Sequence, residues 1–398
     1  MLTVSVYLNG NSGHLRLFRL DMYDCIVVGA GPAGTATAYQ LARQSFSVLL
    51  LEKEALPRYK PCSGAVSPSI TRYFDFDFTP AIDREIRRVR YTWKLEDPVE
   101  AELDTIDPIW MVNREVFDQF LVNKAKSAGV EVKDRAAVTA IKPDHDGWQV
   151  VTAIGVFHAA YLVGADGAKG PTAKWLGFPD LELRQASTLE VDTGIPVDEN
   201  CAINFEFGLV KQGCLWNFPK SRGYSIGAVT FRGKAERDYR KALQQYSQAF
   251  GLTADQGTVY SHPLKLWNGK HALHSRRAVL VGEAAAIVDP LSAEGIRPGM
   301  ISGTKAAEAI GAALHGKPGA LARYTHDMQH LWGNDMQWAK RISTLFFRVP
   351  GIGYRVGIKR PTATKRLGQI LAGELQYADI ADRVIKRMSG GLISGKKG

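Results

Sequence analysis

The sequence predicts an α/β fold in which a parallel-sheet domain is interrupted by an antiparallel-sheet domain and followed by a C-terminal helical segment. A strand, a glycine-rich turn and a helix follow one another over residues 23–43, short aromatic strands occupy the middle of the chain, and the strand-then-helix pattern returns after Arg277. The expected domains are an N-terminal extension at 1–21, the parallel-sheet domain at 22–172 and 272–335, the antiparallel-sheet domain at 173–271 with parts of 70–110, and a basic helical segment and tail at 336–398.

The parallel-sheet domain begins with a βαβ unit. Residues 23–29 form a largely apolar run typical of a buried strand, a helix is expected from Ala33 to Arg43, and a second strand from Ser47 to Leu51 ends in Glu52. Further on, apolar side chains at helical spacing predict one more helix before the sheet continues. These later elements are expected at Arg114–Ala128, Val130–Val132, Trp148–Val151, Ile154–His158 and Tyr161–Val163.

The middle of the chain has the pattern of an antiparallel sheet. Its segments are short, rich in aromatic residues and separated by turns that contain glycine. Strands are expected at Cys201–Phe207, Cys214–Phe218 and Tyr224–Phe231, with a helix over Ala235–Phe250. The α/β pattern then resumes with a strand at Ala278–Gly282 and a long helix that begins near Gly295.

The positive charge of the chain is concentrated at its C-terminus. The net charge is +10, and residues from Leu331 onward hold 13 Lys and Arg against 4 Asp and Glu, whereas the preceding residues hold 37 against 36. A nearly neutral body gives no basic face for nucleic acid, so no nucleic-acid partner is predicted. Two interpretations of the basic segment stay open: peripheral contact with an anionic membrane, or a solvated surface helix with a disordered end.

The location of the protein is constrained by what the sequence lacks. The longest uncharged run, residues 147–165, is interrupted by polar residues, so no transmembrane span is predicted. Four widely spaced cysteines favour a reducing compartment. We therefore expect a cytoplasmic protein, peripheral at a membrane surface if the basic segment binds lipid, and at a photosynthetic membrane if the source is a phototroph. Residues 1–21 weakly resemble a transit segment, but a disordered or wrongly assigned start explains them better.

A glycine motif predicts a dinucleotide site. Residues 29–34 read G-x-G-x-x-G between a strand and a helix, and Glu52 lies 18 residues beyond the third glycine, where it can accept hydrogen bonds from ribose hydroxyls. An acidic residue at this position favours FAD or NAD over NADP. The residues expected at the dinucleotide are Gly29, Gly31, Pro32, Ala33, Gly34, Glu52 and Lys53.

Three later segments decide between FAD and NAD. Together, Asn113–Asp118, Val163–Gly167 and Val281–Ile296 resemble the FAD-binding superfamily built like p-hydroxybenzoate hydroxylase. The resemblance implies a discontinuous FAD-binding, Rossmann-like domain with an inserted substrate-binding domain, and it places Glu283 where aspartate is usual. The further FAD contacts that it implies are Cys62, Arg114, Asp166, Gly167, Gly282, Glu283, Pro290, Gly295 and Ile296.

Two motifs resemble the geranylgeranyl reductase family. Residues 57–66 are similar to its P-x-x-[YK]-x-P-C-G-[GD]-A segment, with Ser63 in place of a glycine. Residues 214–219 are similar to its Y-x-W-x-F-P signature, with Cys214 in place of the first aromatic residue. The resemblance implies reduction of isolated double bonds in a prenyl chain, with FAD reduced by an external donor, usually NADPH, that visits transiently.

Such a reaction needs a hydride, a proton and a tunnel that holds an apolar chain in register over the flavin. Cys62 or Tyr59 could deliver or relay the proton, or Cys62 could be a small buried packing residue. The aromatic residues of the antiparallel sheet could line the tunnel or fill the core. The expected prenyl contacts are Phe205, Phe207, Trp216, Phe218 and Pro219.

The sequence gives weaker support to other functions and to a metal site. The same fold serves flavin-dependent monooxygenases and halogenases, and Trp216 to Pro219 partly resemble the W-x-W-x-I-P of halogenases. A non-catalytic, membrane-associated FAD-binding protein is the alternative from another class. His326 and His330 are four residues apart on a predicted helix without a third ligand, so no metal site is predicted.

Overall fold

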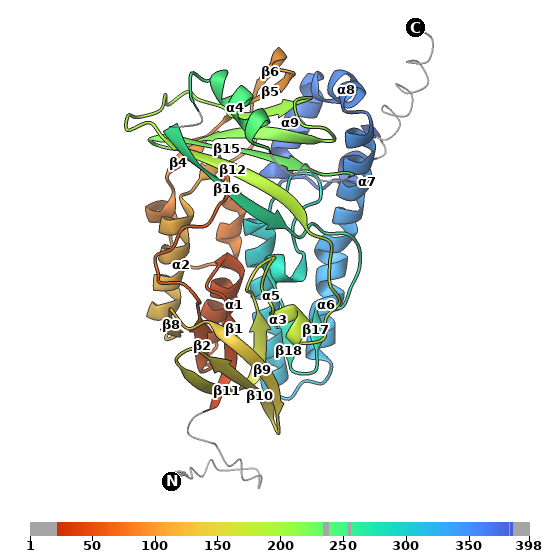
Figure 1. Cartoon of the computed structure of the whole chain (residues 1–398). Helices are drawn as coiled ribbons and strands as arrows, with labels where there is room; N and C mark the ends of the chain where they lie inside the picture. The colour runs from red at the N-terminus through yellow and green to blue at the C-terminus, as the bar shows by residue number, and fades with distance from the viewer. Residues whose placement is uncertain (1–21, 234–238, 254–255, 382, 385–398) are drawn as a thin grey trace.

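A computed structural model describes residues 22–233, 239–253, 256–381 and 383–384. It confirms the α/β fold with an inserted antiparallel sheet and C-terminal helices; the expectations for residues 1–21 and for the end of the tail lie outside the described residues. The parallel sheet lies at the N-terminal end of the molecule, below the antiparallel sheet (Figure 1). Its strands run in the order β17 (His274–Ser275), β18 (Ala278–Leu280), β11 (Gly155–Gly164), β1 (Met22–Val28), β2 (Val48–Leu51) and β8 (Glu131–Lys133).

Helices α1 (Pro32–Ala42) and α5 (Ile296–Leu314) pack against each other beside this sheet. They approach closely because Gly303 of α5 has no side chain: a Cβ there would lie 2.3 Å from the carbonyl oxygen of Ala33. Neighbouring helices are α2 (Arg114–Ser127), α3 (Thr172–Trp175) and α6 (Ala320–Met328). The close contact places the N-termini of α1 and α5 near each other, since Gly282 and Gly299 also approach Ala33.

One element differs from the prediction. The two strands expected at Ile154–His158 and Tyr161–Val163 are a single strand, β11. Its first half pairs antiparallel with β10 (Gly147–Thr152), which pairs with β9 (Val138–Asp144), and its second half pairs parallel with β1 and β18. Hydrogen bonds continue through Ala159, so the chain stays extended where its sequence pattern looks interrupted.

The inserted sheet gathers strands from distant segments. Its order is β16 (Gly257–Leu264), β12 (Arg184–Asp192), β15 (Gly223–Thr230), β14 (Gly213–Pro219), β13 (Ile203–Phe207), β5 (Arg88–Trp93) and β6 (Glu96–Glu102). All adjacent pairs are antiparallel except β13 with β5. Helix α4 (Arg240–Gln248) covers one face with Leu243 and Tyr246, whereas residues 235–238 of the predicted helix lie outside the described residues. The opposite face is therefore free to meet the cofactor domain and the C-terminal helices.

A small sheet and two short helices connect the two larger sheets. They comprise β3 (Ala65–Val66), β7 (Ile109–Met111), β4 (Arg84–Ile86), η1 (Pro68–Tyr73) and η2 (Thr79–Ala81). Strand β3 pairs with β7, and the loop that precedes β3 carries Cys62. This connection fixes the cysteine motif between the two large sheets.

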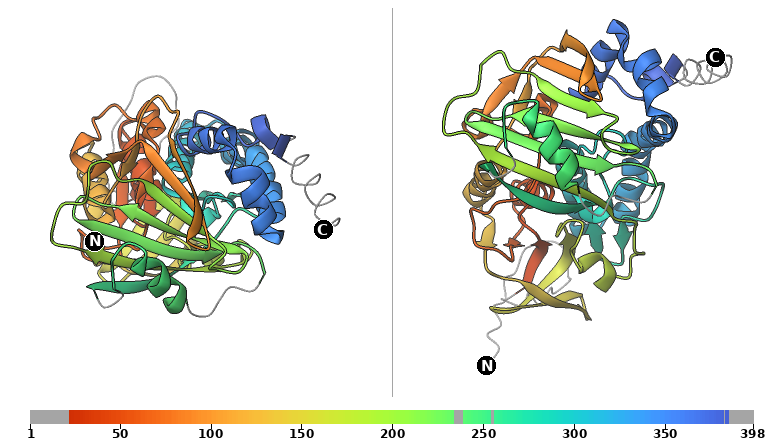
Figure 2. Two further views of the ribbon diagram at one scale, coloured as in Figure 1. Left: turned by 90° about the horizontal axis from the view of Figure 1, so that it is seen from above. Right: turned by 45° about the horizontal axis from the view of Figure 1, so that its top comes forward.

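The C-terminal segment packs beside the antiparallel sheet (Figure 2). It contains η5 (Gln329–Gly333), α7 (Asn334–Arg348), α8 (Pro350–Gly353), η6 (Tyr354–Ile358) and α9 (Pro361–Leu371). Phe347 of α7 stacks on Phe231 with ring centroids 4.7 Å apart, and Phe346 meets Phe207 at 5.2 Å. Helices α7 and α9 of this segment thus contribute side chains to the core. No helix among the described residues is both long and apolar enough to cross a membrane.

Candidate functional site

The three glycines of the β1–α1 turn have separate structural roles. Gly29 has φ +109°, and a Cβ there would lie 2.4 Å from the carbonyl oxygen of Ala165. A Cβ on Gly34 would lie 2.0 Å from the carbonyl oxygen of Gly29, so this glycine is needed for packing. A Cβ on Gly31 would instead have only Nη2 of Arg58 within 4 Å, at 3.9 Å, and Gly31 caps α1 without a side-chain hydrogen bond. Free backbone N–H groups at this helix start suit a pyrophosphate.

Next to this turn, Glu52 belongs to a buried ion-pair network. Its Oε2 accepts a hydrogen bond from the Ala30 N–H at 3.0 Å and pairs with Nε of Arg58 at 3.1 Å. Arg58 also pairs with Asp118 at 3.0 Å, and Nε and Nη2 of Arg114 donate to the two carboxylate oxygens of Asp118 at 2.8 Å each. The network thus connects Glu52 and Arg114, which were predicted, through Arg58, which was not.

Two carboxylates at the carboxyl ends of β11 and β18 retain unpaired buried oxygens. Among the described residues, Oδ1 of Asp166 and Oε1 of Glu283 have no hydrogen-bond partner. Burial raises the pKa of Asp166 against the opposing hydrogen bonds from Thr172. Unsatisfied buried acceptors are costly, so these oxygens suit the hydroxyl groups of a bound ligand. With the open glycine turn, they show that the residues present fit FAD.

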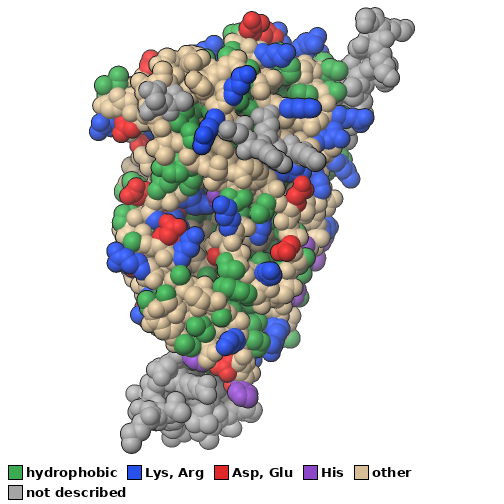
Figure 3. Space-filling view, in the orientation of Figure 1, with side chains coloured by type: hydrophobic (Ala, Val, Ile, Leu, Met, Phe, Trp, Pro, Cys, Tyr) green, Lys and Arg blue, Asp and Glu red, His purple; other side chains and the backbone are tan. Residues whose placement is uncertain are grey.

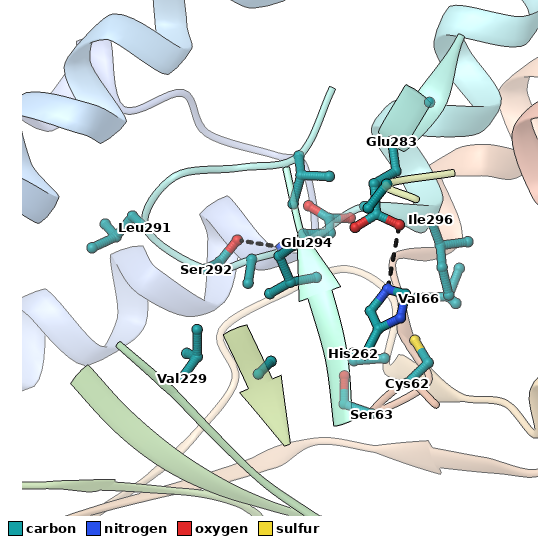
Figure 4. Close-up of a pocket in the computed structure, with 18 of the residues that line it drawn as sticks. Cys62, Ser63, Val66, Val229, His262, Glu283, Leu291, Ser292, Glu294 and Ile296 are labelled. Atoms are coloured by element: carbon teal, nitrogen blue, oxygen red, sulfur yellow. Dashed lines mark hydrogen bonds and ion pairs between the residues drawn. The ribbon is translucent and has the colours of Figure 1, made fainter. Parts of the chain in front are cut away.

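Glu283 also lies close to two basic side chains, and the contact with His262 is drawn in Figure 4. Its Oε2 lies 3.4 Å from Nε2 of His262 and 3.8 Å from Nζ of Lys60. Burial raises the pKa of Glu283, but the His262 hydrogen bond and the positive charge of Lys60 outweigh burial and leave that pKa lowered. The carboxylate is therefore ionised at neutral pH, and the longer side chain found in place of aspartate reaches His262 of the antiparallel sheet.

A cavity of about 650 Å³ continues from the dinucleotide turn to the C-terminal helices. It is bounded by one face of the antiparallel sheet, since alternate residues of β13 and β14 line it. The predicted residues that line it are Gly29, Gly31, Pro32, Ala33, Glu52, Lys53, Tyr59, Cys62, Arg114, Asp166, Gly167, Phe205, Phe207, Trp216, Phe218, Gly282, Glu283, Gly295 and Ile296. Gly34, Pro219 and Pro290 do not line it.

Pro219 is separated from the cavity by the pleat of its strand. It follows Phe218 on β14 and therefore points to the opposite face of the sheet. Pro290 lies between Asp289 and Leu291 in the loop before α5, where Leu291 rather than the proline reaches the cavity. Each proline thus lies next to a residue that lines the cavity, Phe218 for Pro219 and Leu291 for Pro290.

The sheet aromatics serve both the cavity and the core. Phe207 and Phe218 are buried, whereas Phe205 and Trp216 are half-buried, and all four line the cavity. The Trp216 ring lies across Gly227 of β15, where a Cβ would come within 1.9 Å of the indole. The two interpretations that the sequence left open are therefore compatible: the same rings fill the core and face the space.

Cys62 is held between the two sheets by Gly64 of its own motif and by Lys220, which follows the second motif. Its Sγ accepts a hydrogen bond from the Gly64 N–H at 3.4 Å. Buried Lys220 donates to the carbonyl oxygens of Ser63 at 2.6 Å and Val112 at 2.9 Å, and burial lowers its pKa. Lys220 thereby joins the end of β14 to the cysteine loop; its place directly after the second motif was the signal in the sequence.

Tyr59 stands at an exposed position of the cavity wall. Tyr59 is 39% exposed, and its ring packs at a tilt against that of Tyr260, with ring centroids 4.4 Å apart. Burial and the negative charge of Glu190, to which it is hydrogen-bonded, raise its pKa, so the phenol keeps its proton at neutral pH. Glu190 on β12 also accepts a hydrogen bond from Ser225 at 2.8 Å. No sequence motif contains Glu190; only the pairing of β12 with β15 brings it here.

The histidine pair lies apart from this site. The rings of His326 and His330 are 4.1 Å apart near the end of α6. Within the described part of the chain, no group of three or more His, Cys, Asp or Glu side chains is arranged to hold a metal ion. Neither histidine lines the cavity described above.

Known FAD-binding proteins are similar to this chain in sequence. The family described as "FAD binding domain" matches residues 22–337. A geranylgeranyl diphosphate reductase of Rhodobacter capsulatus is 31% identical over 326 residues, which cover 75% of this chain and 78% of the relative. The chain belongs to the geranylgeranyl reductase family of FAD-dependent oxidoreductases.

Solved structures share the fold of this family member. A geranylgeranyl bacteriochlorophyll reductase-like protein from Thermoplasma acidophilum has a TM-score of 0.74 at 18% identity, covering 93% of this chain and 96% of that one. A flavin-dependent brominase has a TM-score of 0.68 at 21% identity, covering 88% and 94%. At these identities both likenesses concern the fold, so the reaction has to be argued from the site.

Proposed function

We propose that this protein reduces isolated carbon–carbon double bonds of a prenyl chain. The observation that carries the proposal is the single cavity that joins the FAD-binding residues to a long apolar surface. Beyond the flavin end, the walls are aromatic and aliphatic side chains of the antiparallel sheet and of α7 and α9. A flexible, water-insoluble prenyl chain fits such a space. The relative of this protein from Rhodobacter capsulatus is named for a geranylgeranyl substrate.

FAD would be held at its pyrophosphate by the β1–α1 turn and at its hydroxyl groups by Asp166 and Glu283. When bound and reduced, FAD supplies a hydride, and NADPH or another external donor restores its reduced form. Side chains of the protein position the alkene, because Trp216, Phe205 and Phe218 restrict the prenyl chain to the space beside Cys62. Restricting both partners to one geometry removes most of the entropic cost of the encounter.

The second carbon of the alkene needs a proton, and two groups of the chain are placed to hold it. The thiol of Cys62 lines the cavity at the cofactor end, beside Ser63 and opposite Glu283 (Figure 4). The phenol of Tyr59 is protonated at neutral pH and is connected to the buried Glu190. We propose that Cys62 donates to the alkene carbon and that Tyr59 with Glu190 relays protons from solvent.

The experiment is anaerobic turnover with mass spectrometry. The holoenzyme is reduced with dithionite and incubated with geranylgeranyl compounds that differ in headgroup. Each reduced double bond adds two hydrogen atoms, so products heavier by about 2 Da per bond are expected without oxygen. Cys62→Ala is expected to lower turnover about 100-fold without loss of bound FAD, within the range for loss of a positioned proton donor.

Two outcomes would contradict the proposal. Products that form only when oxygen is admitted would indicate a monooxygenase, or a halogenase if halide is also required. Flavin that no prenyl compound reoxidises anaerobically would indicate a protein in which FAD serves stability alone. Normal turnover by Cys62→Ala would remove the thiol from the mechanism and leave the reductase assignment in place.

Contact with a membrane would bring a water-insoluble substrate to this cavity. The support is the gathering of Lys and Arg side chains on the upper right of the molecule, where the C-terminal helices lie (Figure 3). Arg348, Lys359 and Arg360 of this region are exposed. We propose that this surface rests against anionic lipid headgroups.

A further inference from the structure

Glu283 connects the cofactor domain with the antiparallel sheet. It lies in η4 (Gly282–Ala285), shortly after β18, whereas His262 belongs to β16 and Lys60 to the loop that precedes β3. Oε2 of Glu283 lies 3.4 Å from Nε2 of His262 and 3.8 Å from Nζ of Lys60, and Nζ and Nε2 are 3.2 Å apart. Figure 4 shows His262 pointing toward Glu283. Three segments that are distant in sequence thus meet at one carboxylate.

His262 is the donor that holds this carboxylate. With the ring proton on Nε2, the imidazole donates to Oε2, and the adjacent negative charge favours that tautomer. Lys60 contributes positive charge, but its Nζ lies beyond hydrogen-bond distance of Oε2. The side chains of His262 and Glu283 are only 18% and 15% exposed, so water and salt screen their contact weakly. The orientation of Glu283 therefore depends on a residue of the antiparallel sheet.

The other oxygen of Glu283 is left for a ligand. Among the described residues, Oε1 is buried and has no hydrogen-bond partner. A carboxylate is planar, so the hydrogen bond at Oε2 also restricts where Oε1 can lie. A buried acceptor held in one position suits a hydroxyl group of FAD, because the side chain does not have to be ordered when the cofactor binds.

The length of the Glu283 side chain makes the contact with His262 possible. An aspartate, which is usual at this position in the superfamily that the sequence resembles, would withdraw the carboxylate by one carbon–carbon bond, roughly 1.5 Å. The present contact is already long at 3.4 Å, so an aspartate would not reach His262. The extra methylene group therefore adds β16 to the surroundings of the cofactor site.

We propose that His262 is a positioning residue for FAD, because it holds Glu283 in the conformation that accepts a hydroxyl group of the cofactor. Through this contact the antiparallel sheet, which also forms a wall of the cavity, takes part in binding FAD. His262 acts through Glu283 and does not itself contact the cofactor. The role concerns cofactor binding, so it does not depend on which substrate the protein reduces.

The test measures the dissociation constant of FAD by diluting the holoenzyme and following flavin fluorescence. His262→Leu removes the N–H donor, whereas His262→Gln keeps an amide N–H near the position of Nε2. Glu283→Asp, alone and combined with His262→Leu, completes a double-mutant cycle. The control is His158→Leu, because His158 pairs with Asp144 at 2.9 Å and does not line the cavity.

Melting temperatures verify that each variant is folded. If His262→Leu does not fold, His262→Asn takes its place, since the asparagine amide is too short to reach Glu283.

We expect His262→Leu to raise the dissociation constant of FAD about tenfold, as for loss of a hydrogen bond to a charged group. His262→Gln should restore binding to within about threefold of wild type, and His158→Leu should bind FAD as wild type does. In the Glu283→Asp background, His262→Leu should change the dissociation constant less than about twofold, because the contact is already lost.

Several results would overturn this role of His262. Unchanged FAD binding in folded His262→Leu would mean that Glu283 needs no support from the sheet. A full loss that persists in the Glu283→Asp background would mean that His262 acts on FAD directly or through packing. Equal losses for the Leu and Gln variants would assign the effect to the imidazole ring, and an equal loss for His158→Leu would assign it to general destabilisation. No prenyl compound is used, so failure of the reductase proposal would leave these outcomes unaffected.

Discussion

At the scale of single residues, the glycine turn separates cofactor binding from packing. A Cβ at Gly31 would meet only Nη2 of Arg58, at 3.9 Å, whereas a Cβ at Gly34 would collide with the Gly29 carbonyl group. The two positions look alike in the sequence motif, and their surroundings distinguish them. This difference makes two alanine substitutions informative as a pair.

We expect Gly31→Ala to weaken FAD binding roughly tenfold, about 1.4 kcal/mol, because the methyl group occupies the approach of the pyrophosphate. The melting temperature of the apoprotein should stay as in wild type. Gly34→Ala should lower the stability of the apoprotein by about 1–3 kcal/mol through overpacking. Flavin fluorescence titration and thermal unfolding measure the two effects; equal destabilisation by both substitutions would contradict this distinction.

A second residue-scale feature is the buried carboxylate of Glu190. Burial raises its pKa, against the opposing charge of Lys220 and the hydrogen bonds from Ser225 and Tyr59. The folded protein therefore holds this proton more tightly than the unfolded chain does. The resulting stabilisation is complete below the unfolded pKa, about 4.3, and is lost as pH rises through the higher folded pKa.

Glu190→Gln should remove this pH dependence. The melting temperature of the variant minus that of wild type is expected to increase between pH 5 and pH 8, since only wild type loses stability by ionisation. Glu96→Gln, a substitution of an exposed carboxylate on β6, serves as the control and should give a constant difference. Parallel curves for Glu190→Gln and wild type would show that Glu190 does not titrate in this range.

At the scale of elements, the C-terminal segment holds the loop that precedes α5. The Tyr377 hydroxyl donates to Oδ2 of Asp289 at 2.7 Å, and Oδ1 of the same carboxylate accepts the N–H groups of Leu291 and Ser292. Leu291 and Ser292 line the cavity at the flavin end. A tyrosine after the last long helix thus stabilises a loop near the cofactor site.

Tyr377→Phe should cost about 1–3 kcal/mol of stability, because it leaves one buried oxygen of Asp289 with fewer donors. It should also weaken FAD binding, since the cavity-lining loop loses its support. Tyr354→Phe is the matched control: its hydroxyl donates to the carbonyl oxygens of Tyr91 and Asp97, away from this loop. We expect similar destabilisation there with unchanged FAD affinity. If both variants bound FAD with equal affinity, the loop would not contribute to FAD binding.

At the scale of the whole molecule, the basic residues of the C-terminal segment that the structure describes belong to packed helices. The basic segment packs α7 and α9 against the antiparallel sheet and closes the cavity. Removing the residues after Pro350 would delete core side chains such as Tyr354 and Ile370 together with the charges. Membrane contact must therefore be tested by changing charge alone.

Replacement of Arg348, Lys359 and Arg360 by Gln should reduce co-sedimentation with anionic vesicles at least tenfold, as each cation near such a surface contributes about 1 kcal/mol. Binding to neutral phosphatidylcholine vesicles should not change. A matched triple variant on the cofactor domain, Lys126, Lys142 and Lys174 to Gln, should bind as wild type does. If both triple variants lose binding equally, net charge rather than the C-terminal surface is responsible.

The sequence by itself determined the cofactor fold and the family. A strand, a glycine turn and a helix are local, and the chemistry of dinucleotide binding requires them at fixed spacing, so residues 29–34 and Glu52 could be identified without a structure. The cysteine motif at residues 57–66 could be identified in the sequence because its residues are also consecutive. These predictions depended on motifs in which neighbours in sequence are also neighbours in space.

Only the tertiary structure decided what surrounds the substrate. Glu190 reaches Tyr59, and Lys220 reaches the Cys62 loop, through strand pairing between distant segments that no periodic pattern records. Arg366 and Leu367 of α9 line the far end of the cavity, although the sequence alone places them in a basic tail. Long-range packing, which no local pattern records, sets which side chains face the cavity.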